Sequence, residues 1–198
     1  IALSTYLKSF KYGDMMIEIK FYGRGGQGAV IASQILAKVF FLMGKYPQCF
    51  SVFGGERRGA PVASFLRIDN KKIYLKCEIR RPDHMIYMAP DLVDEKEVES
   101  ILKPNGLILI NNALTTNEFK PLQKFRLALI DALSVSEEAG LGATINTAIL
   151  GAYARASGEI SMGYLEQAIR ETVPAKIEAN VTAAKRAYEL TRVIEGVN

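Results

Sequence analysis

Two short segments of this sequence concentrate the residues best suited to bind an anion. The first is Gly23-Arg24-Gly25-Gly26-Gln27-Gly28, in which Gly23, Gly25 and Gly28 match the pattern G-x-G-x-x-G. Glycines permit a tight turn with close backbone approach, and the N–H groups at the start of a following helix attract negative charge. We therefore expect a phosphate or diphosphate at this turn, with Arg24 and Gln27 as side-chain partners. The alternative is a turn that only joins a strand to a helix.

A dinucleotide such as NAD or FAD is a further alternative for the same turn. The dinucleotide-binding fold places an acidic residue about 20 residues beyond the glycines, where it binds a ribose hydroxyl. Between Met43 and Phe53 the sequence has no Asp or Glu, and Glu56 comes next, inside a second glycine-rich loop. The missing acid argues against NAD.

The second segment is Phe53-Gly54-Gly55-Glu56-Arg57-Arg58-Gly59-Ala60-Pro61. Arginine holds phosphate or carboxylate through two parallel hydrogen bonds, so Arg57 and Arg58, beside Glu56, are candidate binding residues. Loops that leave the carboxyl ends of strands share one crevice in an open α/β sheet. If the strands before the two loops are neighbours, the loops meet in that crevice. The alternative is a solvated surface loop.

The other chemically capable residues are isolated. His84 is the single histidine, and we expect a structural role because no second histidine accompanies it. Cys49 and Cys77 lie in apolar, strand-like stretches and are expected to be buried, inert thiols. Because an iron–sulfur cluster takes four thiolates, two cysteines cannot hold one, and we predict no metal site. Asn146 and Asn180 either hydrogen-bond to backbone or face the crevice.

The hydrophobic pattern predicts strands alternating with helices, followed by a helical last third. The predicted strands are 17–22, 49–53, 62–68, 73–77, 85–88, 107–110 and 127–130, with 62–68 and 73–77 paired around the turn signal Asp69-Asn70. The predicted helices are 29–43, 91–102, 143–156, 162–172 and 175–195. This order predicts a three-layer α/β/α, Rossmann-like domain over 15–198, with a mostly parallel or mixed sheet.

Composition narrows the class of protein. In 198 residues, 49% are hydrophobic and 23% charged, which excludes disordered, collagen-like and coiled-coil chains. The net charge of +4 suits an anionic small molecule, and no nucleic-acid motif is present. No apolar run is long enough for a membrane span, so we expect a cytoplasmic protein. Residues 1–14 do not read as a secretory signal and are expected to be an N-terminal extension or foreign residues.

Taken together, these motifs resemble those of one family. Besides the two glycine–arginine segments, the resemblance takes in Leu66-Arg67-Ile68, Pro82-Asp83, Leu102-Lys103-Pro104-Asn105-Gly106, Asn146-Thr147-Ala148-Ile149-Leu150-Gly151 and Asn180. It covers about Met16 to Asn198. The sequence is similar to the gamma subunit, or equivalent domain, of 2-oxoacid:ferredoxin oxidoreductases, of which pyruvate:ferredoxin oxidoreductase is the best known.

The resemblance implies that the cofactors and the reaction are distributed over several subunits. Such enzymes convert a 2-oxoacid, coenzyme A and oxidised ferredoxin into acyl-CoA, carbon dioxide and reduced ferredoxin. It implies alpha, beta and delta partner subunits, with thiamine diphosphate mainly between alpha and beta and the iron–sulfur clusters in delta and beta. The gamma chain is then a structural, Rossmann-like subunit whose Gly23–Gly28 turn and Arg57-Arg58 lie near the coenzyme A path or the active-site entrance.

Details of the second loop refine the resemblance. Ala60-Pro61 is similar to the pyruvate and branched-chain members and favours those substrates, whereas Phe53 stands where the family often has Tyr. The isolated chain is expected to be inactive, because it lacks a thiamine site, a cluster and a nucleophile. Two other interpretations stay open: a free-standing, nucleotide-binding oxidoreductase of Rossmann type, and a scaffold domain without a ligand.

Overall fold

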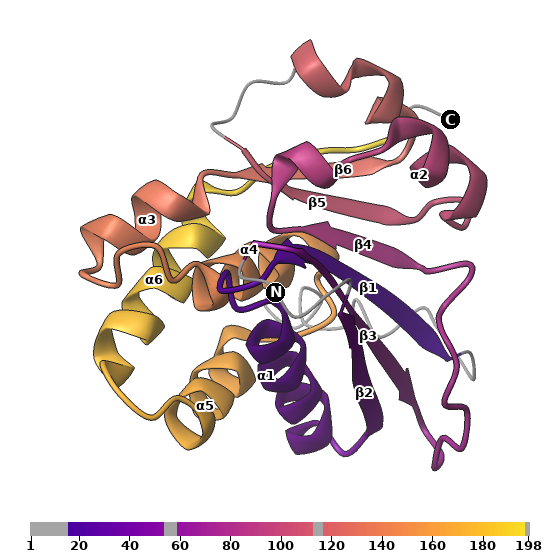
Figure 1. Cartoon of the computed structure of the whole chain (residues 1–198). Coiled ribbons are helices and arrows are strands. Elements are labelled where there is room, and N and C mark those ends of the chain that lie inside the picture. Colours follow the sequence, from indigo (N-terminus) through magenta and orange to yellow (C-terminus); the bar gives the residue numbers. More distant parts are fainter. Residues whose placement is uncertain (1–15, 54–58, 113–116, 197–198) are drawn as a thin grey trace, which may run out of the picture.

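A seven-stranded mixed sheet organises the chain in a computed structural model that describes residues 16–53, 59–112 and 117–196 (Figure 1). The strand order is β2-β3-β1-β4-β5-β6-β7. The strands are β1 Ile17–Arg24, β2 Tyr46–Phe53, β3 Pro61–Asp69, β4 His84–Tyr87, β5 Leu107–Asn111, β6 Arg126–Ile130 and β7 Arg192–Ile194.

The centre of the sheet is parallel and its borders are antiparallel. Strands β1, β4, β5 and β6 run parallel, with Phe21 opposite Ile86 and Ile86 opposite Leu109. Strand β3 is antiparallel to both β1 and β2, and β7 is antiparallel to β6. Strands β4, β5 and β6 are nearly continuous apolar runs because both faces of a parallel sheet are buried, whereas β1 alternates buried and half-buried residues.

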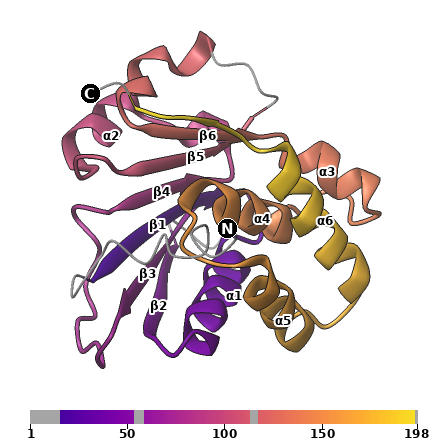
Figure 2. The ribbon, with the colours of Figure 1, turned by 180° about the vertical axis from the view of Figure 1, so that it is seen from behind.

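Helices cover both faces of the sheet (Figures 1 and 2). The helices are α1 Ala29–Leu42, α2 Glu95–Ile101, α3 Ala132–Glu138, α4 Asn146–Ser157, α5 Met162–Thr172 and α6 Ile177–Leu190, with short 3-10 helices at Pro90–Leu92 and Asn117–Lys124. Within the described ranges, none of these helices is long and apolar enough to cross a membrane.

Two hydrophobic cores lie on opposite faces of the sheet and define the three layers. Along β5, Leu107 and Leu109 face the core formed with α1, α3, α4, α5 and α6, whereas Ile108 and Ile110 face the core formed with α2 and the 3-10 helix Asn117–Lys124. This alternation follows from the two-residue period of a strand. The predicted three-layer α/β/α fold with a mixed sheet and a helical last third is confirmed.

The predicted pairing of 62–68 with 73–77 is wrong. Strand β3 extends from Pro61 to Asp69, but β1 and β2 occupy its two edges, so no edge remains for a further strand. Residues 73–77 consequently lie in an irregular segment between β3 and β4. The condition that β1 and β2 are neighbours is also not met, because β3 lies between them.

Two predicted helices are shorter than expected. The last helix ends at Leu190, and Arg192–Ile194 form β7, because the β-branched Val193 and Ile194 pair with β6. The acidic helix begins at Glu95 instead of 91, since the carboxylate of Asp94 caps it by accepting hydrogen bonds from the backbone N–H groups of Lys96 and Glu97.

Candidate functional site

The turn from β1 into α1 leaves the start of the helix free of acidic charge. Gly28 precedes the first helical residue with φ +85°, and Gly26 has φ +98°, values that a side chain rarely tolerates. The first turn of α1 contains no acidic residue, and Gly28 has no side chain to cap it. The partial positive charge of the helix start is therefore available to an anion.

The end of the second glycine-rich loop lies directly on this turn. The N–H of Gly25 donates to the carbonyl of Ala60 (2.9 Å), and the N–H of Gly59 donates to the carbonyl of Gly25 (3.3 Å). The two loops are brought together by β3, whose first residue Pro61 pairs with Arg24, and not by adjacent parallel strands. The candidate residues Glu56, Arg57 and Arg58 lie outside the described residues.

The side chains of Arg24 and Gln27 are engaged within the turn. Arg24 donates through Nε (3.1 Å) and Nη2 to Asp91 and through Nη1 to the carbonyl of Gly59 (3.0 Å). Hydrogen bonding to Arg24 holds the pKa of the Asp91 carboxyl below its usual value. Gln27 accepts a hydrogen bond from the backbone N–H of Arg24 (2.8 Å). Both side chains thus stabilise the turn, and their contact with a ligand stays a prediction.

Asn146 comes from the distant helix α4 and lies against Gly28. A Cβ placed on Gly28 would be 3.3 Å from Nδ2 of Asn146, whose Oδ1 accepts from the N–H of Thr147 (2.8 Å). Asn146 is the first residue of α4, and the first turn of α4 also lacks acidic residues. The amino-terminal ends of α1 and α4 therefore converge at one point. Sequence reasoning missed this convergence, because only the packing of the helices creates it.

The other asparagine that sequence reasoning left open joins α4 to α6. Asn180 accepts from Oγ1 of Thr147 (3.0 Å) and donates to the carbonyl of Lys176 (3.0 Å). It is 5% exposed, so its polar atoms are satisfied within the protein. Of the two alternatives for Asn180, the structure supports hydrogen bonding at a helix contact.

His84 lies at the amino end of the central strand β4, whereas the glycine turn follows the carboxyl end of the neighbouring parallel strand β1. Its Nδ1 is 2.9 Å from the hydroxyl of Tyr153, and its Nε2 is 3.7 Å from Glu159. Burial lowers the pKa of His84 to about 4 and raises the pKa of Glu159 to about 7. Both groups are therefore neutral between these values, as burial demands. This position is remote from the Gly28–Asn146 contact.

The cysteines differ from the prediction of two buried thiols. Cys77 is exposed, because the strand predicted around it does not form. Cys49 is half-buried on β2, with its sulfur 3.1 Å from Oγ of Ser33. Among the described residues, no three His, Cys, Asp or Glu side chains are grouped as a metal site.

A comparison with protein families shows to which family the chain belongs. Residues 18–190 match the family model described as pyruvate ferredoxin/flavodoxin oxidoreductase. The chain belongs to this family. The matched span includes the Gly23–Gly28 turn and Asn146, so both parts of the convergence lie inside the family domain.

Individual relatives agree with the family model. The chain is 46% identical over 185 residues to the pyruvate/ketoisovalerate oxidoreductases common subunit gamma of Pyrococcus furiosus, covering 91% of this chain and 100% of that one. It is 45% identical over 176 residues to the pyruvate synthase subunit PorC of Methanothermobacter marburgensis, covering 88% and 97%. The crystal structure of the pyruvate oxidoreductase subunit PORC of Thermotoga maritima superposes with a TM-score of 0.78 at 30% identity, covering 91% and 99%. The resemblance seen in the sequence is confirmed.

Proposed function

We propose that this chain is the gamma subunit of a thiamine-diphosphate-dependent 2-oxoacid:ferredoxin oxidoreductase that makes acyl-CoA, carbon dioxide and reduced ferredoxin. The observation that carries the proposal is 46% identity over the whole length of a gamma subunit named for pyruvate and ketoisovalerate. Pyruvate or a branched-chain 2-oxoacid is accordingly the proposed substrate. The alpha, beta and delta subunits and ferredoxin are the proposed partners.

The proposed role of this chain is to hold the diphosphate of coenzyme A where α1 and α4 converge. Coenzyme A, when bound, supplies the thiol that accepts the acyl group. The space beside Gly28 that a Cβ would fill lies next to the amide nitrogen of Asn146, which is a hydrogen-bond donor. Backbone N–H groups at the two helix starts supply further donors and positive potential. The groups present therefore fit a diphosphate.

Thiamine diphosphate and the iron–sulfur clusters are proposed to lie on the partner subunits. The chain has two cysteines, whereas a cluster takes four thiolates. Cys49 contacts Ser33 at the interface of β2 with α1, and Cys77 lies on the exposed segment after β3. The donor set of this chain therefore does not fit a cluster.

A free-standing dinucleotide-binding enzyme is less well supported. A dinucleotide-binding half places a parallel strand next to the first strand, with an acid that binds the ribose. Here β4 is parallel to β1, but the strand on the other side of β1, β3, is antiparallel, so the run of parallel strands that such a fold continues on both sides of β1 is interrupted. The sequence also lacks the acid between Met43 and Phe53.

Affinity purification of this chain from its native cells, followed by mass spectrometry, tests the proposal. We expect stoichiometric recovery of a thiamine-binding chain and a cysteine-rich chain. The recovered complex should reduce ferredoxin when given pyruvate or a branched-chain 2-oxoacid, and only if coenzyme A is present. Recovery of this chain alone, as a stable monomer or homodimer, would overturn the proposal.

A further inference from the structure

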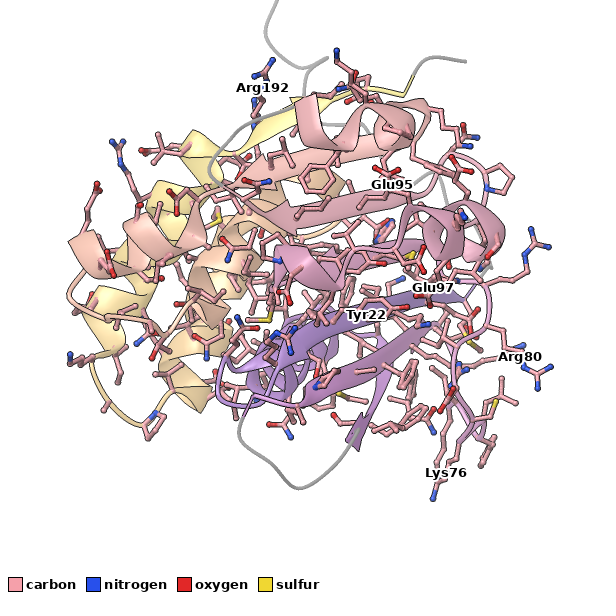
Figure 3. The ribbon with its side chains drawn as sticks, turned by 45° about the horizontal axis from the view of Figure 1, so that its top comes forward. Tyr22, Lys76, Arg80, Glu95, Glu97 and Arg192 are labelled. Carbon is pink, nitrogen blue, oxygen red and sulfur yellow. The ribbon has the colours of Figure 1, made fainter. Side chains whose placement is uncertain are left out.

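The segment between β3 and β4 concentrates positive charge at one edge of the molecule. Residues 71–81 read Lys-Lys-Ile-Tyr-Leu-Lys-Cys-Glu-Ile-Arg-Arg, with five basic side chains and one acidic side chain. They form no helix or strand, and Lys76 and Arg80 project outward from the body of the protein (Figure 3). We call residues 71–81 the basic arm.

The basic arm also exposes large apolar side chains. Tyr74 is 78% exposed and its neighbour Leu75 is 51% exposed, whereas Ile79 is 2% exposed and anchors the arm to the body. A tyrosine beside arginines is typical of the residues that carry binding energy at protein interfaces. The arm thus presents both an apolar and a cationic surface.

A buried arginine holds the basic arm in place from beneath. The side chain of Arg67 is 3% exposed; its Nε donates to Glu18 (2.9 Å), its Nη1 to the carbonyl of Cys77 (2.7 Å) and its Nη2 to the carbonyl of Glu78 (3.3 Å). The backbone of the arm is therefore fixed although it lacks secondary structure. Preorganisation of this kind lowers the entropy lost when a partner binds.

A cavity of about 580 Å³ opens between the basic arm, the start of β1 and the end of β3. It is lined by Glu18, Arg67, Leu75, Cys77, Glu78, Arg80 and Arg81. Arg67 is paired with Glu18, but Arg80 and Arg81 are exposed and form no ion pair with another described residue. Their guanidinium groups are therefore available to a carboxylate, which arginine binds through two parallel hydrogen bonds.

We propose that the basic arm is a docking surface for an acidic segment of another subunit of the complex. In this contact Tyr74 and Leu75 are buried, and Arg80 and Arg81 pair with Asp or Glu side chains that enter the cavity. The inference rests on the proposed function, because it requires that the chain has partner subunits. Complementary charge would fix the register of the two chains and accelerate their association.

The acidic stretch of this chain itself is a poorer occupant of the surface. In Asp91–Glu99, Asp91 already pairs with Arg24 and Glu99 with Lys124, so a second copy would have to break these contacts. Residues 1–15 contain two lysines and one aspartate, and their net charge therefore has the same sign as that of the arm. The charge pattern thus favours a different chain.

The test is charge reversal in the assembled complex. We compare the triple variant Lys76→Glu, Arg80→Glu, Arg81→Glu with a control triple variant in which the exposed cations Lys120, Arg155 and Arg192 become Glu. We expect the arm variant to co-purify about tenfold less partner subunit at physiological ionic strength, and the control to match wild type. Unchanged thermal unfolding of both variants shows that folding is not the cause.

A photo-crosslinking residue at Tyr74 gives a second, independent measurement. We expect crosslinks to a peptide of a partner subunit that is rich in Asp and Glu. Crosslinks only to nucleic acid or to a second copy of this chain would overturn the inference, as would an arm variant that assembles like wild type at every salt concentration. In those cases the proposed function would still stand. If the wild-type chain co-purified with no partner subunit, both the proposed function and this inference would be overturned.

Discussion

The amide of Asn146 lies against the α-carbon of Gly28, so the first residue of α4 contacts the residue that precedes α1. The contact joins positions 118 apart in the sequence, and a Cβ on Gly28 would be 3.3 Å from both Cβ and Nδ2 of Asn146. Two helix starts without acidic residues consequently face the same space. The partial positive charges of the two helix starts add together there, so the potential is more positive than one helix alone would produce.

Gly28→Ala should weaken coenzyme A binding by the complex. The new methyl group would meet Asn146, and φ of +85° costs an L-residue about 1–2 kcal/mol. Gly26→Ala is the matched control, because φ is +98° but nothing lies within 4 Å of the added Cβ. We expect both variants to lose stability in thermal unfolding, and only Gly28→Ala to raise the KM for coenzyme A. Equal KM values in the two variants would count against a ligand beside Gly28.

Asn146→Asp should raise the KM for coenzyme A more than Asn146→Ala does. The aspartate replaces a donor with a negative charge that repels a diphosphate, whereas alanine only removes the donor. Steady-state kinetics of the complex should show an increase of about tenfold in KM for the aspartate variant, with kcat little changed. An aspartate variant with the KM of the alanine variant would show that no anion binds there.

Variants of the Arg24–Asp91 pair test whether Arg24 contacts the ligand or only stabilises the turn. If Arg24 acts mainly through its pair with Asp91, Arg24→Gln and Asp91→Asn should change the KM for coenzyme A by similar factors, because each breaks that pair, although Arg24→Gln also removes the hydrogen bond to the carbonyl of Gly59. We expect this result, with coupling in the double variant. A large effect of Arg24→Gln with none of Asp91→Asn would instead indicate that Arg24 touches the ligand directly.

Gly151→Ala should strongly destabilise the fold. An added Cβ would be 1.9 Å from the backbone carbonyl oxygen of Ala184, where α4 and α6 cross. Because backbone cannot move aside as a side chain does, we expect a loss of about 3 kcal/mol or more in the free energy of unfolding. Gly163→Ala on α5 is the control: its nearest atom is 3.9 Å away, and we expect a gain of about 0.5–1 kcal/mol. Chemical denaturation measures both.

The buried pair His84 and Glu159 should give opposite dependences of stability on pH. Folding lowers the pKa of His84 from 6.5 to about 4. The contribution of His84 to folding stability is therefore complete above pH 6.5 and is lost as the pH falls through 4. Folding raises the pKa of Glu159 from 4.5 to about 7. The contribution of Glu159 to folding stability is therefore complete below pH 4.5 and is lost as the pH rises through 7. Between pH 4.5 and 6.5 the two slopes largely cancel.

Glu159→Gln should leave the contribution of His84 as the remaining part of this pH dependence of stability. Relative to wild type, the free energy of unfolding of this variant should increase as the pH rises from 4.5 to 7 and then level off. The control Glu137→Gln changes an exposed carboxylate and should show no such trend. Urea denaturation at a series of pH values measures the difference. A variant curve parallel to wild type would mean that folding does not raise the pKa of Glu159.

Local patterns predicted most of the elements. Alternation in Ile17–Tyr22 and the following glycines indicated β1 and the turn, and the boundaries of α5 were predicted as observed. The errors at 73–77 and 191–195 have one cause. A strand needs an edge to pair with, and whether β3 or β6 offers one depends on which strands already occupy it.

The sequence by itself determined the layer order, the glycine turn and the family, because hydrophobic period, glycine spacing and motif residues are local properties of the chain. Only the tertiary structure decided that β3 separates β1 from β2, that Arg24 binds Asp91, and that Asn146 meets Gly28. These relations join residues 67 to 118 positions apart, or depend on which strand edges are free. Contacts at such separations are set by how the helices and strands pack, and no local pattern records that packing.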